Sequence, residues 1–221
     1  MHADQRGFFL ESYRRSRFAQ LGIERDFVQD NHSRSARGIV RGMHFQPGMS
    51  KLVRCARGAI FGAVVDVRRG SPTFGQWEAF ELDDVDHRQL YCPDGFAHGF
   101  CVLSEVADVV YRCSTYYDPA IEGGFAYDDP QVAIGWPKDV ELIASARDSS
   151  APRLAEVEAG LPFHYHDDER DCDGGPDPSD CPDGALDQRI DTRGGGDGAR
   201  DQRIDTRGGG DGAPGRRIRH P

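Results

Sequence analysis

The most constraining feature of the sequence is a series of short β-rich runs that continues from Ile39 to Cys113. Clusters of turn-forming residues separate the runs, for example Gln46-Pro47-Gly48 and Pro93-Asp94-Gly95. Many short strands at near-regular spacing are typical of a sandwich, jelly roll or barrel, so we predict an all-β fold. Helical periodicity is limited to Phe8–Leu21 and Pro152–Ala159. The predicted strands are Ile39–Phe45, Leu52–Ala56, Ile60–Val67, Trp77–Leu82, Gln89–Cys92, Phe100–Leu103 and Val106–Cys113.

The composition changes near Tyr165 and divides the chain into two parts. Residues 165–221 are rich in glycine and aspartate, and their apolar residues are isolated. Such a segment cannot bury enough apolar surface to offset its chain entropy, so we predict a disordered C-terminal tail. It contains a tandem 13-residue repeat, because Asp187–Ala199 and Asp201–Ala213 read the same letters, DQRIDTRGGGDGA. We therefore predict one folded domain over residues 1–164 and a low-complexity tail over residues 165–221.

Charge and apolar patterning exclude several classes of protein. The formal charge of −10 argues against a dedicated nucleic-acid binder, which normally presents a basic face. The chain has no apolar run long enough to span a membrane and no signal-peptide core at Met1–Arg6, so we expect a cytoplasmic protein. The six cysteines form no C-x-x-C pair, which weakens both a zinc site and a disulfide framework. We interpret Cys55, Cys101 and Cys113 as small buried apolar residues.

Chemistry-bearing residues gather in a few stretches. Alternate residues of a strand share a face, so Gly42, His44 and Gln46 are predicted to point one way and Met43 and Phe45 the other. This places His44 in the lumen or mouth of the barrel. Taken singly, these residues have ordinary structural explanations: a hydrogen-bonded His44, core packing for Tyr111, a turn cap at Asp148 and a surface position for Lys51.

Taken together, short blocks from Asp4 to about Leu154 resemble one known family, the dTDP-4-dehydrorhamnose 3,5-epimerases. These enzymes are jelly-roll cupins of deoxysugar biosynthesis, so the resemblance implies a cupin-type jelly roll with a few short flanking helices. The matching blocks are DQRGFFLESY (Asp4–Tyr13), FVQDNHSRS (Phe27–Ser35), RGMHFQ (Arg41–Gln46), KLVRC (Lys51–Cys55), SPTFGQW (Ser71–Trp77), PDGFAHGF (Pro93–Phe100), VLSE (Val102–Glu105), YYDP (Tyr116–Pro119) and SARD (Ser145–Asp148).

The resemblance implies an epimerase of a dTDP-4-keto-6-deoxyhexose that removes a proton next to the ketone and returns one to the opposite face. It implies His44 as the base, Asp148 as the carboxylate that orients it, Lys51 as the cation near the ketone oxygen and Tyr111 as the proton donor. It also implies a homodimer without metal or other cofactor. The residues that match nucleotide-sugar-binding positions are Arg6, Glu11, Gln29, Asn31, Arg41, His98, Tyr117, Glu122 and Arg147.

Three alternatives remain open at this point. The protein could be a mono-epimerase of secondary-metabolite sugars, a metal-binding cupin, or a non-catalytic nucleotide-sugar binder. Gln46 stands where a His-x-His metal pair would place its second histidine, which weakens the metal-binding alternative. The loop between Gln46 and Lys51 has only four residues, fewer than in most relatives, which predicts a displaced Lys51.

Overall fold

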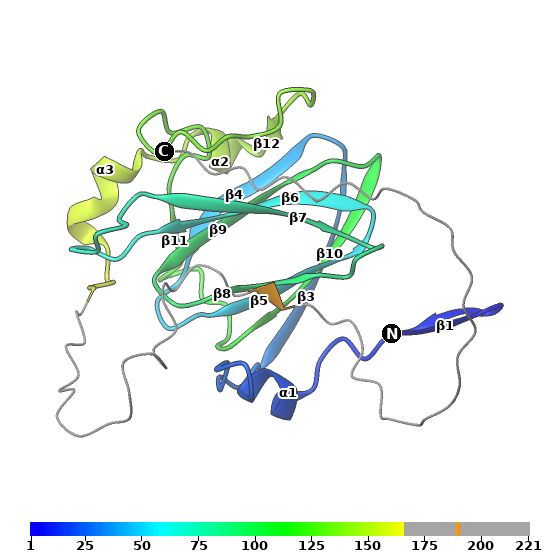
Figure 1. Ribbon diagram of the computed structural model, residues 1–221. Helices are drawn as coiled ribbons and strands as arrows, with labels where there is room; N and C mark the ends of the chain where they lie inside the picture. Colours follow the sequence, from blue (N-terminus) through cyan, green and yellow to red (C-terminus); the bar gives the residue numbers. More distant parts are fainter. Residues whose placement is uncertain (166–188, 191–221) are drawn as a thin grey trace, which may run out of the picture.

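Two antiparallel sheets face each other in the computed structural model, which describes residues 1–165 and 189–190 (Figure 1). No helix among these residues is long and apolar enough to cross a membrane. The strands are β1 (His2–Asp4), β2 (Gly7–Phe9), β3 (Gln29–Ala36), β4 (Ile39–Phe45), β5 (Lys51–Arg57), β6 (Ala59–Asp66), β7 (Trp77–Asp83), β8 (Gln89–Cys92), β9 (Phe96–Val102), β10 (Val106–Cys113), β11 (Gly123–Gly124), β12 (Ile143–Ala144) and β13 (Arg189–Ile190). The helices are α1 (Arg15–Ala19), α2 (Ala146–Ser149), α3 (Leu154–Val157) and the 3-10 turn Glu158–Gly160.

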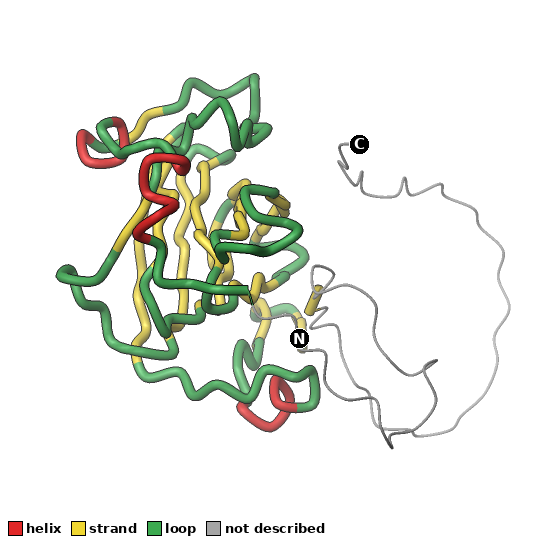
Figure 2. Tube along the Cα trace, turned by 90° about the vertical axis from the view of Figure 1, so that its left-hand side faces the viewer, coloured by secondary structure: helices red, strands yellow, loops and turns green. Residues whose placement is uncertain are grey.

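The strand order explains the two layers. One sheet has the order β13-β8-β5-β10-β3, and the other has the order β11-β4-β9-β6-β7 with the parallel strand β12 added to β4. Helix α1 lies on the side of the first sheet, whereas α2 and α3 lie on the side of the second (Figures 1 and 2). The all-β prediction is therefore confirmed, and the predicted bounds match at β4, β8 and β10. Strand β9 differs most from its prediction: it spans Phe96–Val102, whereas Phe100–Leu103 was predicted.

Two of the three apolar clusters among the described residues cover the two faces of the six-stranded sheet. Val53, Phe100 and Val109 belong to the cluster between the two sheets. A second cluster, which includes Met43 and Phe125, covers the opposite face of β4, β6 and β9 with the segment that follows β11. Strand β9 lies between these two clusters and is a continuous run of buried residues. The cysteines predicted to be buried, Cys55, Cys101 and Cys113, are buried and free, as is Cys92.

The N-terminal prediction is wrong in part. Only Arg15–Ala19 of the predicted helical stretch is helical, and Gly7–Phe9 forms strand β2 instead. The hairpin β1–β2 projects from the body of the molecule (Figure 1), and Phe8 and Phe9 are largely exposed. The apolar spacing there therefore does not mark a helix face packed on this chain's own core. Of the predicted tail, only Tyr165 and β13 are described; β13 pairs with β8. Disorder in the remainder, including Cys172 and Cys181, is a prediction that lies outside the described residues.

Strand β4 departs from simple alternation near Gly42, where its backbone lies close to Gly99 of β9. The pairing of β4 with β9 shifts register between Arg41 and His44, so Arg41 and His44 both face the space between the sheets. The predicted face of Gly42, His44 and Gln46 is wrong in this respect, because Arg41 takes the place of Gly42 beside His44. Gly42 has a φ of +143°, and a Cβ added there would lie 2.5 Å from Gly99 Cα.

We expect Gly42→Ala to lower the free energy of unfolding by about 3 kcal/mol, because it adds a backbone clash to an unfavourable φ. Gly22→Ala is the matched control: Gly22 also has a positive φ, of +80°, but a Cβ there would meet no atom within 4 Å. The control should lose only about 1 kcal/mol. Urea unfolding followed by circular dichroism measures both, and equal losses would contradict the close approach of β4 and β9.

Candidate active site

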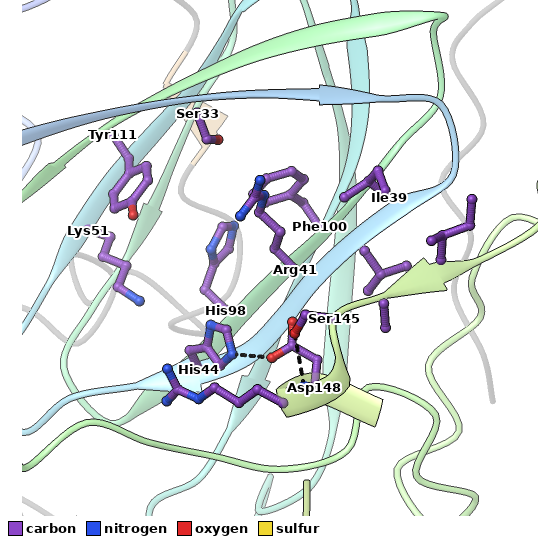
Figure 3. A pocket seen from close by; sticks show the side chains of 14 residues that line it. Ser33, Ile39, Arg41, His44, Lys51, His98, Phe100, Tyr111, Ser145 and Asp148 are labelled. Carbon is purple, nitrogen blue, oxygen red and sulfur yellow. Dashed lines mark hydrogen bonds and ion pairs between the residues drawn. The ribbon is translucent and has the colours of Figure 1, made fainter. Parts of the chain in front are cut away.

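A cavity of about 480 Å³ opens between the two sheets and is closed at one side by β12 and α2 (Figure 3). Strands β4 and β9 of one sheet and β3, β5 and β10 of the other supply its walls. Its lining includes most of the residues singled out from the sequence, so the fold gathers segments that are distant in the chain. The predicted site residues that line the cavity are Arg41, His44, Lys51, His98, Tyr111, Arg147 and Asp148.

His44 and Asp148 form a direct pair. The two residues are 104 positions apart in the chain, and His44 Nε2 lies 2.7 Å from Asp148 Oδ1. Asp148 is only 5% exposed and sits in α2, where its backbone N–H donates to the Ser145 hydroxyl that caps the helix. An ionised carboxylate can only accept, so Nε2 carries the hydrogen and Nδ1 carries the lone pair. This histidine is therefore oriented with a basic nitrogen available on its other side.

Lys51 and Tyr111 form the opposite wall. They come from β5 and β10 of the five-stranded sheet, whereas His44 comes from β4 of the six-stranded sheet. In Figure 3 the Lys51 amine and the Tyr111 hydroxyl point into the same part of the cavity. Burial raises the pKa of Tyr111, so its phenol keeps its proton at neutral pH. The loop before Lys51 is short, yet Lys51 lines the cavity. Among the described residues, no carboxylate forms an ion pair with Lys51.

His98 is, like Asp148, a buried ionisable group of the cavity wall. Burial, followed by the charges of Lys51 and His44, lowers the pKa of His98 to about 3. Its Nε2 has no hydrogen-bond partner in the part of the chain that the structure describes. The ring is therefore a neutral imidazole with one unpaired polar atom at the cavity.

We expect the protein to lose stability between pH 7 and pH 5 in part because of His98. In the unfolded chain His98 binds a proton with an ordinary pKa of 6.5, whereas in the folded chain it stays neutral down to about pH 3. The unfolded state therefore binds more protons in this window, which costs the folded state about 2 kcal/mol. His98→Gln should remove that part of the loss in urea unfolding at the two pH values. An unchanged pH dependence in this variant would contradict the assignment.

Cationic groups and their polar partners line the rim. Arg41 donates through Nε to the Ser35 hydroxyl at 3.1 Å, and no carboxylate among the described residues pairs with it. Arg147 Nη2 donates to Glu122 Oε2 at 2.6 Å, and the Tyr117 hydroxyl donates to the same oxygen at 3.0 Å. The Glu122 contact therefore links Tyr117 to the cavity. Arg41, Arg147 and Lys51 all line the cavity, and this excess of cationic groups suits an anionic ligand.

Six predicted binding residues do not line this cavity: Tyr117 and Glu122, which are connected to it through Arg147, and Gln29, Asn31, Arg6 and Glu11. Gln29 and Asn31 are on β3, and Asn31 is directly opposite Tyr111 of β10. Arg6 is highly exposed and pairs with Asp4, whereas Glu11 pairs with arginines of the same N-terminal segment. The structure therefore does not bring Arg6 and Glu11 to the cavity of their own chain.

Some lining residues were not identified from the sequence. Ser145 carried a usable signal, since Ser145-x-x-Asp148 has the spacing of a helix N-terminus with its acidic third residue. Asp148 is thus the capped residue of α2 and not the turn cap. Ser33 and Phe100 also line the cavity, and no sequence pattern distinguishes them from other strand residues. Within the described residues, no group of three His, Cys, Asp or Glu side chains is placed to hold a metal ion.

The fold and the cavity define a class: jelly-roll proteins of the cupin type with a polar site between their sheets. The family model for dTDP-4-dehydrorhamnose 3,5-epimerase matches residues 1–156. The chain belongs to this family, as its short motifs predict.

Relatives named for two different reactions are almost equally similar to this chain. The chain is 48% identical over 158 residues to the dTDP-4-dehydrorhamnose 3,5-epimerase of Salmonella typhimurium, covering 70% of this chain and 86% of that protein. It is 49% identical over 164 residues to the dTDP-4-dehydrorhamnose 3-epimerase of Streptomyces niveus, covering 72% and 79%. A crystal structure of the Legionella pneumophila 3,5-epimerase in complex with dTDP-4-keto-L-rhamnose has a TM-score of 0.71 at 46% identity, over 74% of this chain and 88% of that one.

Proposed function

We propose that this protein inverts carbon 3, carbon 5 or both of dTDP-4-dehydro-6-deoxy-D-glucose, giving dTDP-4-dehydro-L-rhamnose or a related deoxysugar. The observation that carries the proposal is the His44–Asp148 pair at 2.7 Å, which faces Tyr111 across one cavity. A base and an acid on opposite sheets suit a reaction that removes a proton from one face of a sugar ring and returns one to the other. Membership of the family supports the same substrate class.

The chemistry follows from the ketone. The carbonyl acidifies the hydrogens on its two neighbouring carbons, and His44 Nδ1 takes one of them while Asp148 holds Nε2–H. The C–H electron pair moves into an enolate, whose oxygen is stabilised by the Lys51 ammonium; one such preorganised group contributes about 3 kcal/mol to the transition state. Tyr111 then donates its phenolic proton to the opposite face of the carbon. Inversion results, and solvent restores both groups.

The rim supplies the binding groups of this proposal. Arg41 and Arg147 bind the diphosphate, because a guanidinium can bond two phosphate oxygens at once. Tyr117 stacks on thymine. The remaining predicted binding residues on this chain are Gln29, Asn31, His98 and Glu122, which lie in or next to the cavity.

A second copy of the chain explains the residues outside the cavity. The hairpin β1–β2 carries Arg6 and exposes Phe8 and Phe9, which is costly for an isolated chain in water. We propose a homodimer in which this hairpin and Glu11 contribute to the partner's site. Sedimentation should give the mass of two chains, and a monomeric active enzyme would contradict the proposal. The free buried thiols support a reducing compartment, so we propose that the dimer is cytoplasmic.

Proton NMR of the keto-sugar in deuterated water tests the reaction. The enzyme should introduce deuterium at carbon 3, carbon 5 or both, and the product's coupling constants report which centre has inverted. Deuterium at neither carbon, with folded protein, would refute the epimerase. Tight substrate binding without exchange would instead identify a non-catalytic binder, and stoichiometric metal in the purified protein would identify a metal-binding cupin. Inversion at carbon 3 alone would identify a mono-epimerase, which the Streptomyces relative makes a specific alternative.

A further inference from the structure

A chain of side-chain amides next to the cavity has only one possible orientation. It begins at the backbone N–H of Tyr117, which donates to Gln29 Oε1 at 3.0 Å. A backbone N–H can only donate, so the Gln29 atom that it contacts must be the carbonyl oxygen. Gln29 Nε2 is then a donor, and it contacts Asn31 Oδ1 at 3.1 Å. The Asn31 amide is thereby fixed with its oxygen toward Gln29 and its nitrogen on the other side.

The nitrogen end of Asn31 faces β10, where Nδ2 donates to Cys113 Sγ at 3.6 Å. Burial raises the pKa of Tyr111, and the Asn31 amide works against that rise, as a donor near the phenol would. Asn31 and Tyr111 are directly opposite in the pairing of β3 with β10, which brings their side chains within reach of each other. Cys113 is 1% exposed and does not line the cavity. Burial raises the pKa of Cys113, so its sulfur remains a neutral thiol that can accept this bond.

The direction of these bonds decides where the Tyr111 proton points. Nδ2 is the donor end of Asn31, so the Tyr111 oxygen can meet it only as an acceptor. The phenolic hydrogen is left free to point away from Asn31. In Figure 3 the Tyr111 hydroxyl lies at the cavity, on the same side as the Lys51 amine.

We propose that Asn31 and Cys113 are positioning residues for proton donation by Tyr111: the Asn31 amide, held at its oxygen by Gln29 and at its nitrogen by Cys113, donates to the Tyr111 hydroxyl and thereby directs the phenolic proton into the cavity. This inference rests on the proposed epimerase function. It gives Cys113 a role in the reaction although Cys113 touches neither the cavity nor the substrate.

Cys113→Ala tests this positioning of Tyr111 through the ratio of the inversion rate to the deuterium-exchange rate. Both rates are those of the bound substrate. Inversion requires Tyr111, whereas deuterium exchange requires only His44, so the ratio of inversion to exchange reports proton donation and is independent of substrate affinity. Loss of one neutral hydrogen bond should lower this ratio about three- to tenfold. Cys113→Ser keeps an acceptor and should restore the ratio to within about twofold. Cys101→Ala removes another buried free thiol, on β9, and should leave the ratio unchanged.

Two further variants keep the test decisive. Asn31→Asp has the same size but cannot donate to Tyr111, so the ratio should fall at least about tenfold even where Cys113→Ala does not fold. In a Tyr111→Phe background, Cys113→Ala should have no further effect, because the hydroxyl it acts through is gone. An unchanged ratio of inversion to exchange in Cys113→Ala or Asn31→Asp would overturn the positioning role. So would an equal fall of the ratio on Cys113→Ala in the wild-type protein and in Tyr111→Phe. A wild-type protein that neither exchanges nor inverts would instead overturn the proposed function.

Discussion

Replacing His44 with alanine should lower deuterium exchange into the keto-sugar by about a thousandfold or more. A positioned general base typically contributes between about 100- and 10,000-fold, and His44 is the imidazole in the cavity that a carboxylate orients. Asp148 cannot replace His44 as the base, because Asp148 is buried and its Oδ1 points to the place that the imidazole ring has left. Exchange rates by proton NMR in deuterated water, at saturating substrate, measure the effect.

The chain contains a matched control for this variant. His32 on β3 also contacts an aspartate, with Nε2 3.2 Å from Asp108 Oδ1, but its side chain is exposed and does not line the cavity. His32→Ala should therefore exchange at close to the wild-type rate. Exchange at the native rate in folded His44→Ala would show that another group is the base, and the mechanism would have to be reassigned.

Replacing Tyr111 with phenylalanine should separate the two halves of the reaction. Inversion should fall about a thousandfold, because the opposite face of the ring loses its proton donor. Deuterium exchange should fall less than about tenfold, because His44, Asp148 and Lys51 are untouched and can still form and reprotonate the enolate on one face. The expected product is therefore deuterated sugar of unchanged stereochemistry.

Tyr91→Phe is the corresponding control, since Tyr91 packs in the small cluster with Phe18 and Leu52 and does not line the cavity. It should invert and exchange at close to the wild-type rates. If Tyr111→Phe lost exchange and inversion in equal proportion, Tyr111 would act in binding or in enolate stabilisation and not as the far-face acid.

The fold was predictable from the sequence where one face of a strand is apolar. Strands β4, β8 and β10 were predicted with their observed bounds, because buried residues recur along each of them. Strand β3 was not predicted. Its sequence, QDNHSRSA, is polar on both faces, because one face meets the cavity side and the other meets solvent. A strand of this kind has no hydrophobic period to recognise.

The site was predictable only in part from the residues themselves. Alternation along β4 placed His44 opposite Met43 and Phe45, and the structure has this arrangement. The same alternation placed Gly42 on the face of His44, where the structure has Arg41. The register shift that causes this lies in the pairing of β4 with β9, so it cannot be recognised from the sequence of β4 alone. The contact between His44 and Asp148 joins distant segments, so no local pattern contains it. It was predicted from the family resemblance, and not from spacing.

The two walls of the cavity belong to different sheets, and this has a consequence for engineering. His44 is carried by β4 and Tyr111 by β10, and these strands are held apart by the apolar side chains between the layers, among them Val53 and Val109. The gap that a sugar ring must fit is thus set by residues that never meet it. Adding or removing a methylene in that interior would widen or narrow the slot while every lining side chain keeps its identity, so stereochemical outcome can be altered from the hidden interior as well as from the exposed rim.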